Sequence, residues 1–147
     1  MLRKAWEPPC DKLGWDDGLP EDLVVEIKDF FLDLYELEKI EFSRSLCPEE
    51  ATVGDPWLIT FSDGSNLGFG AVVYIQWELK SGGWWSTIVV SKSKIGPKSH
   101  LMIPRMELNG AVINKRITEF VQTTLSRKFE KVIHLVDSST VLSYLHK

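Results

Sequence analysis

Apolar residues recur at helical spacing near the start of the chain. After Pro20 and two acidic residues, apolar side chains stand three or four positions apart as far as Leu37. A proline followed by acidic residues suits the positive N-terminal end of a helix. The spacing therefore predicts an amphipathic helix over residues 20–37, with an apolar stripe that packs on a neighbouring surface. The stripe consists of Leu23, Ile27, Phe30, Phe31 and Leu34.

The pattern becomes that of strands after residue 55. A short apolar run over residues 57–61 ends at the turn-forming residues 62–66. Two longer runs, residues 67–79 and 84–90, are rich in β-branched and aromatic residues and flank a Gly-Gly turn. These runs predict a hairpin and, together with the first run, three antiparallel strands.

A helix, a strand and a final helix follow. Apolar residues on one face predict a helix from about Pro104 to Leu125. The run over residues 132–136 predicts a strand that is buried on both faces and parallel to the first strand. Residues 138–140 can cap a last helix. The resulting order, β-β-β-α-β-α behind an N-terminal helix, predicts an α/β protein with a mixed sheet.

Charge divides the chain at the same point as the pattern. Residues 1–55 hold 6 Lys and Arg against 15 Asp and Glu, a net charge of −9, whereas residues 56–147 hold 11 against 6, a net +5. We therefore expect a connector over residues 1–55 and a sheet domain over residues 56–147. The overall charge of −4 argues against nucleic-acid binding, but the basic second part favours it. An ordinary variation of surface charge along the chain is the alternative.

Several classes of protein are excluded by what the sequence does not contain. No apolar stretch is long enough to span a bilayer, and the N-terminus has no apolar signal core, so an intracellular, cytoplasmic protein is expected. Cys10 and Cys47 are the only cysteines and have no His or Cys at ligand spacing. They indicate neither a zinc site nor a disulfide framework.

Three carboxylates stand where chemistry is expected in an α/β protein. Asp63 and Asp137 each follow an apolar strand, and ligands gather at the carboxyl ends of such strands. Glu107 lies in the first turn of the intervening helix. Three carboxylates at one point repel one another unless a cation intervenes, and Mg²⁺ prefers oxygen ligands. Taken singly, each residue could equally be a turn residue or a first-turn acid.

Four motifs in this order resemble the ribonuclease H domain of BEL/Pao-type retrotransposon polyproteins. The resemblance extends upstream, where residues 13–23 are similar to the stretch that joins the polymerase part to ribonuclease H in the same polyproteins. The four motifs are residues 60–65 (TFSDGS), 68–72 (GFGAV), 103–112 (IPRMELNGAV) and 137–142 (DSSTVL).

The resemblance implies a ribonuclease H-like fold and hydrolysis of RNA in RNA–DNA hybrids with two Mg²⁺ or Mn²⁺ ions. Asp63 would bind both ions, and Glu107 and Asp137 would bind the ion beside the attacking water. The polymerase part of the same polyprotein is an implied partner.

Six further residues are candidates for contact with nucleic acid. Gly64, Ser65 and Asn66 are placed to meet a phosphate or a ribose 2′-hydroxyl, or they form only a tight turn. The other three, Lys92, Lys94 and Arg105, form a basic edge before and within the start of the helix that carries Glu107, or simply a solvated surface.

The sequence departs from the family pattern at its end. Ribonucleases H of this kind use a fourth carboxylate, an Asp well after the third, and this sequence ends at Lys147 without that Asp, the last strand or the closing helix. The resemblance therefore implies weak or absent cleavage by this chain. The chain would then be a fragment, a degenerate genomic copy or a reused gene product. A non-catalytic module that binds nucleic acid or a protein partner is the alternative function. The order Asp, Glu, Asp disfavours an integrase-like enzyme, in which the glutamate comes last.

Overall fold

The computed structural model describes residues 14, 16–41, 43–97 and 102–145. Contacts divide the chain into two compact units, Met1–Phe42 and Ser43–Lys147. Cys47 is exposed and unpaired, and Cys10 lies outside the described residues. No helix among the described residues has the length and apolar character needed to cross a membrane.

The first unit contains the predicted amphipathic helix. Helix α1 spans Glu21–Glu36 and continues into a short 3-10 helix, η3, over Leu37–Lys39. Pro20 precedes the helix, and two acidic residues occupy its first turn, as the helix dipole favours.

Burial varies along the α1 stripe. Leu23 is buried, but Phe30, Phe31 and Leu34 are 46%, 55% and 39% exposed. These three side chains of the stripe are therefore only partly covered within the structure. Helical spacing determines which side chains share a face, but it does not supply the surface that covers them.

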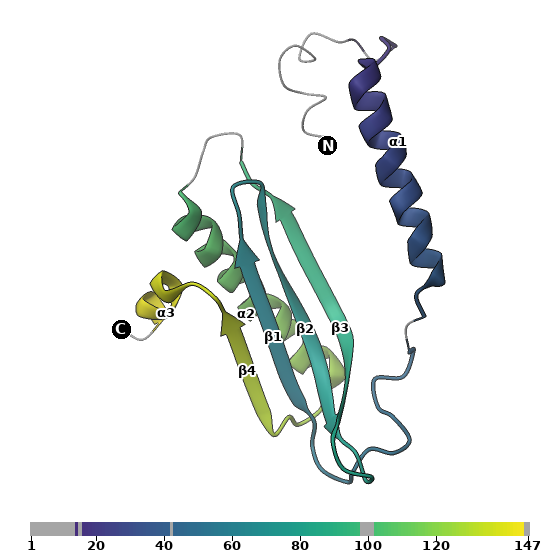
Figure 1. The fold of residues 1–147 in the computed structure, drawn as a ribbon. Coiled ribbons are helices and arrows are strands. Elements are labelled where there is room, and N and C mark those ends of the chain that lie inside the picture. The colour runs from purple at the N-terminus through teal and green to yellow at the C-terminus, as the bar shows by residue number, and fades with distance from the viewer. Residues whose placement is uncertain (1–13, 15, 42, 98–101, 146–147) are drawn as a thin grey trace. The chain divides into compact units, whose positions relative to one another are not determined.

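The second unit has the predicted α/β order (Figure 1). Strand β1 pairs antiparallel with β2, β2 pairs antiparallel with β3, and β4 pairs parallel with β1, so the sheet order is β3-β2-β1-β4. Helix α2 packs against β1 and β2, and the short α3 follows β4. The elements are β1 (Trp57–Gly64), β2 (Gly68–Glu78), β3 (Trp84–Ile95), α2 (Ile103–Leu125), β4 (Lys131–Val136) and α3 (Ser139–Leu145).

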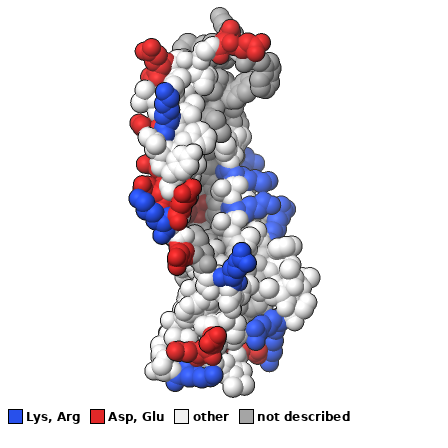
Figure 2. Space-filling model, turned by 90° about the vertical axis from the view of Figure 1, so that its right-hand side faces the viewer, with Lys and Arg blue, Asp and Glu red and all other residues white. Residues whose placement is uncertain are grey.

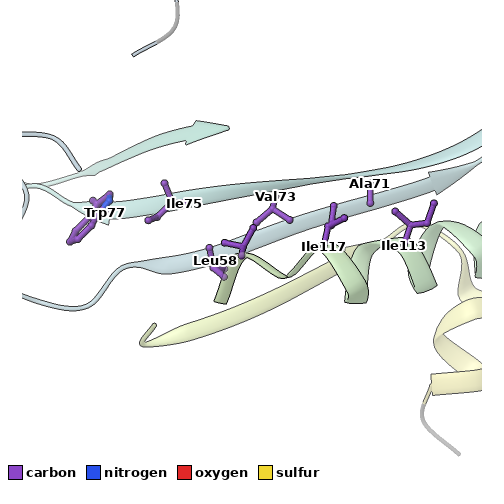
Figure 3. Packing of buried hydrophobic residues seen from close by; sticks show 8 residues of the cluster. Leu58, Ala71, Val73, Ile75, Trp77, Ile113 and Ile117 are labelled. Atoms are coloured by element: carbon purple, nitrogen blue, oxygen red, sulfur yellow. The ribbon is translucent and has the colours of Figure 1, made fainter. Parts of the chain in front are cut away.

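The core lies between α2 and one face of the sheet (Figure 3). In β1 and β2 alternate residues are buried, because successive side chains of a strand point to opposite faces. Apolar residues of the two strands meet one apolar face of α2. The buried cluster consists of Leu58, Ala71, Val73, Ile75, Trp77, Ile113, Ile117 and Val121.

Hydrogen bonds hold the segment before β1 against the C-terminal end of β2. Trp77 Nε1 donates a hydrogen bond to the Leu46 carbonyl at 2.6 Å, and the amide of Thr52 donates to the Glu78 carbonyl at 2.9 Å. Residues 43–55 therefore form part of the sheet unit, at the end where β1 begins and β2 ends.

Strand β4 is less buried than predicted. Val132 and Leu135 are 36% and 42% exposed, so the expected burial on both faces was wrong. The parallel pairing with β1 is as predicted. The difference arises because β4 is the last strand in the order of the described sheet and α2 packs against β1 and β2 instead. An apolar run by itself does not distinguish a central strand from an edge strand.

Candidate functional site

Two glycines let the end of β1 contact the start of α2. A Cβ atom at Gly64 would lie 2.4 Å from the amide nitrogen of Glu107, and one at Gly110 would lie 2.8 Å from the carbonyl oxygen of Asp63. Real Cβ atoms essentially never approach so closely. The absence of both side chains thus permits the backbones that carry Asp63 and Glu107 to touch.

Strand β4 brings the third acidic residue to the same end. In the parallel ladder Ser62 pairs with Val136, the last residue of β4. Asp63 and Asp137 are therefore the next residues along two neighbouring strands, which lie about 4.8 Å apart in a sheet. Both residues line one open groove of about 1040 Å³ at this end of the sheet. The backbones of all three predicted residues thus meet at one place.

The three side chains do not meet as closely as their backbones. Asp63 Oδ1 accepts a hydrogen bond from the Gly64 amide at 2.6 Å, and Glu107 Oε2 accepts one from Ser138 Oγ at 2.6 Å. Within the described part of the chain, no three His, Cys, Asp or Glu side chains lie together so that they could hold a metal ion. The close gathering of all three carboxylates that we expected is therefore not found there.

Strand alternation explains this arrangement. Leu58, Thr60, Ser62 and Gly64 are buried towards α2, whereas Asp63 occupies an exposed position between them. Asp63 therefore points to the face of the sheet opposite α2, while Glu107 extends from α2 itself. The donor set still suits a hard divalent cation in kind, because it consists of carboxylate oxygens at a solvent-accessible sheet end.

The predicted nucleic-acid contacts form two groups. Between β1 and β2, Ser65 closes a turn: its amide donates to the Gly68 carbonyl at 2.8 Å, and its Oγ accepts from the Leu67 amide at 3.3 Å. The Gly64 amide is engaged by Asp63, and the neighbouring Asn66 is exposed. The tight turn that the sequence allowed is thus present.

Two of the basic residues line the groove, and the third lies at the start of α2. Lys92 and Lys94 are exposed residues of β3, which continues beyond the predicted strand end at residue 90, and they line the same groove as Asp63. Arg105 is exposed in the first turn of α2. Blue Lys and Arg side chains are numerous over the sheet unit in Figure 2, which agrees with the net positive charge of residues 56–147.

The contact between Ser138 and Glu107 is not indicated by the sequence. The residues are 31 positions apart, and a serine after a strand indicates only a helix cap. Gly110 was likewise not singled out, since a glycine within a helical pattern does not reveal which backbone approaches it.

Comparison with known proteins agrees with this architecture. The family model described as "Pao retrotransposon-like RNaseH-like domain" matches residues 1–138. No curated protein and no solved structure matches the chain. The match covers most of the sequence, including the three acidic residues and the turn after Asp63. The chain therefore belongs to the family of Pao retrotransposon-like RNaseH-like domains.

Proposed function

We propose that the chain is a metal-dependent nuclease module that hydrolyses the RNA strand of RNA–DNA hybrids. The observation that supports this proposal is that the backbone positions of Asp63, Asp137 and Glu107 lie at one end of the sheet, through the β1–β4 register and the contact of Gly64 with α2. Membership of a retrotransposon RNaseH-like family supports the same chemistry.

Each acidic residue has a distinct place in the proposed site. Asp63 and Asp137, on neighbouring strand ends, would hold a divalent cation from the groove side, and Glu107 would complete the set from the helix. Mg²⁺ or Mn²⁺ bound there would activate water and stabilise the leaving oxygen. Without the cation the chain has only mutually repelling carboxylates beside a phosphate, so binding and catalysis both require the metal.

The remaining polar groups would hold the nucleic acid. Lys92, Lys94 and Arg105 supply positive charge around the acidic centre and would neutralise phosphates on each side of the scissile bond. Exposed Asn66, next to the Ser65 turn, is suited to a ribose 2′-hydroxyl, the group that distinguishes RNA from DNA. We further propose that the unit containing α1 contacts the polymerase part of the same polyprotein through its exposed apolar residues.

Cleavage of a labelled RNA–DNA hybrid in Mg²⁺ or Mn²⁺ tests the proposed activity. We expect slow cleavage of the hybrid and none of matched double-stranded DNA, and a further fall in Asp63→Asn of at least the 10–100-fold that loss of an outer-shell partner typically costs a metal site. Asp55→Asn, which removes an exposed carboxylate elsewhere in the same unit, is the matched control and retains the activity. Equal cleavage by Asp63→Asn and the unmodified chain would refute the proposal.

A second candidate function is a non-catalytic module that binds the hybrid. The observation that favours it is that no three metal-ligating side chains of the described residues lie together. This function predicts salt-dependent hybrid binding that Asp63→Asn retains, with no cleavage by either chain in either metal. A binding titration carried out beside the cleavage assay separates the two functions.

A further inference from the structure

We propose that Ser138 is a positioning residue that fixes the Glu107 carboxylate beside Asp137 for cation binding. The inference rests on the proposed function, because it assigns a task within the same site. Ser138 directly follows Asp137 and is only 8% exposed, which is unusual for a serine at a strand-to-helix junction unless its hydroxyl is used.

The hydroxyl of Ser138 makes two hydrogen bonds of different kinds. It donates its single proton to Glu107 Oε2 at 2.6 Å and accepts the Val141 amide at 3.3 Å. The Leu142 amide in turn donates to the Ser138 carbonyl at 3.1 Å. One side chain thus caps helix α3 and binds Glu107 at the same time.

The bond to Glu107 has a direct consequence for the proposed site. A glutamate has three side-chain dihedrals, and fixing them at the moment of cation binding costs conformational entropy. The Ser138 hydroxyl holds one carboxylate oxygen through a short, charge-assisted bond and leaves Oε1 available. Glu107 is thereby held next to the residue that follows Asp137, so part of the ordering is complete before the ion arrives.

The cap role and the positioning role are separable by substitution. Ser138→Ala removes both hydrogen bonds. Ser138→Gly removes both as well, but glycine at the N-cap destabilises a helix much less than alanine does. Ser138→Thr retains a hydroxyl and restores both. Ser143→Ala, which removes an exposed hydroxyl bonded only to the Thr140 carbonyl within α3, is the matched control.

Two measurements on the whole chain then distinguish the roles. Calorimetric titration with Mn²⁺ alone measures cation binding without any cleavage, and hydrogen exchange over the amides of α3 measures how well the helix is capped. We expect Ser138→Ala and Ser138→Gly to weaken Mn²⁺ binding equally, by about 10–100-fold, whereas Ser138→Thr and Ser143→Ala bind as the unmodified chain does. Exchange over α3 should be clearly faster in the Ala variant than in the Gly variant, because alanine is the poorer N-cap.

Several outcomes would overturn the inference. Unchanged Mn²⁺ affinity in Ser138→Gly would show that the serine is only a cap. Tighter Mn²⁺ binding by Ser138→Ala would show that the hydroxyl competes with the ion for Glu107. If the unmodified chain did not bind Mn²⁺ at all, Ser138 could have no role in cation binding. If Mn²⁺ binds as expected but no hybrid is cleaved, the proposed activity fails while the role of Ser138 stands.

Discussion

Replacing Gly64 by alanine tests whether the contact between β1 and α2 sets the geometry of the site. The new Cβ would lie 2.4 Å from both the Glu107 amide nitrogen and the Met106 carbonyl carbon, and 2.7 Å from the Met106 carbonyl oxygen. The strand and the helix must separate by about 1 Å before these contacts reach the 3.4 Å of ordinary van der Waals contact. All three atoms belong to the backbone, so no side chain can rotate away.

The expected cost follows from that displacement. Inserting a methyl group into a packed interface usually costs about 1–3 kcal/mol, and the rigid surroundings place this substitution at the upper end. Gly64 does not have a positive φ, so alanine suits its backbone and the clash alone decides the sign. We expect a loss of about 3 kcal/mol in the free energy of unfolding, a large part of the roughly 5–15 kcal/mol of a typical domain.

Urea unfolding followed by tryptophan fluorescence measures the effect. The control is Gly54→Ala, where the nearest atom to the new Cβ is Thr52 Oγ1 at 3.6 Å, an ordinary contact. This variant should be as stable as the unmodified chain or up to about 1 kcal/mol more stable, because alanine restricts the unfolded chain. Equal stability of the Gly64→Ala and Gly54→Ala variants would refute the close approach of β1 and α2.

Three further predictions concern the sheet. Leu58→Ala, at a fully buried position, should lower the free energy of unfolding by about 2–5 kcal/mol, whereas Leu67→Ala, at a position 75% exposed, should change it by less than about 0.5 kcal/mol; equal losses would contradict the assigned core. Ser62→Ala should not destabilise, because Ser62 Oγ is a buried atom that has no hydrogen-bond partner among the described residues; a loss above about 1 kcal/mol in chemical unfolding would show that it has one. Burial lowers the pKa of His134 below its usual 6.5, so the unfolded chain binds the proton more readily and stability falls as the pH drops below about 6.5. Unfolding at pH 7.5 and 5.5 should show a smaller loss for His134→Gln, and an identical loss would count against this assignment.

The topology of the sheet unit was predictable because its signals are local. Alternation marks β1 and β2, the Gly-Gly turn marks the hairpin, and helical spacing marks α2. The positions of Asp63 and Asp137 after two strands placed both residues at one end of the sheet, since parallel neighbours end together, but they did not determine how the carboxyl groups point.

The remaining features depend on tertiary context. The exposure of Leu135 follows from the place of β4 in the sheet order. The exposure of Phe31 depends on which surface covers the α1 stripe. An apolar run in the sequence predicts neither. The orientation of Asp63 away from α2 was in principle readable from strand alternation. The bond between Glu107 and Ser138 was not readable, because it joins two elements that sequence spacing does not relate.

The fastening of residues 43–55 has a mechanical consequence. The segment is anchored at the Glu78 end of β2, whereas Gly70, eight residues earlier in the same strand, pairs with Asp63. At about 3.3 Å per strand residue the anchor lies roughly 26 Å from the acidic end of the sheet. Tension applied through the chain before Ser43 would therefore load the hydrogen bonds at the base of the hairpin first. A force of this kind would act on the hydrogen bonds of Thr52 and Trp77 before it acted on the acidic end of the sheet.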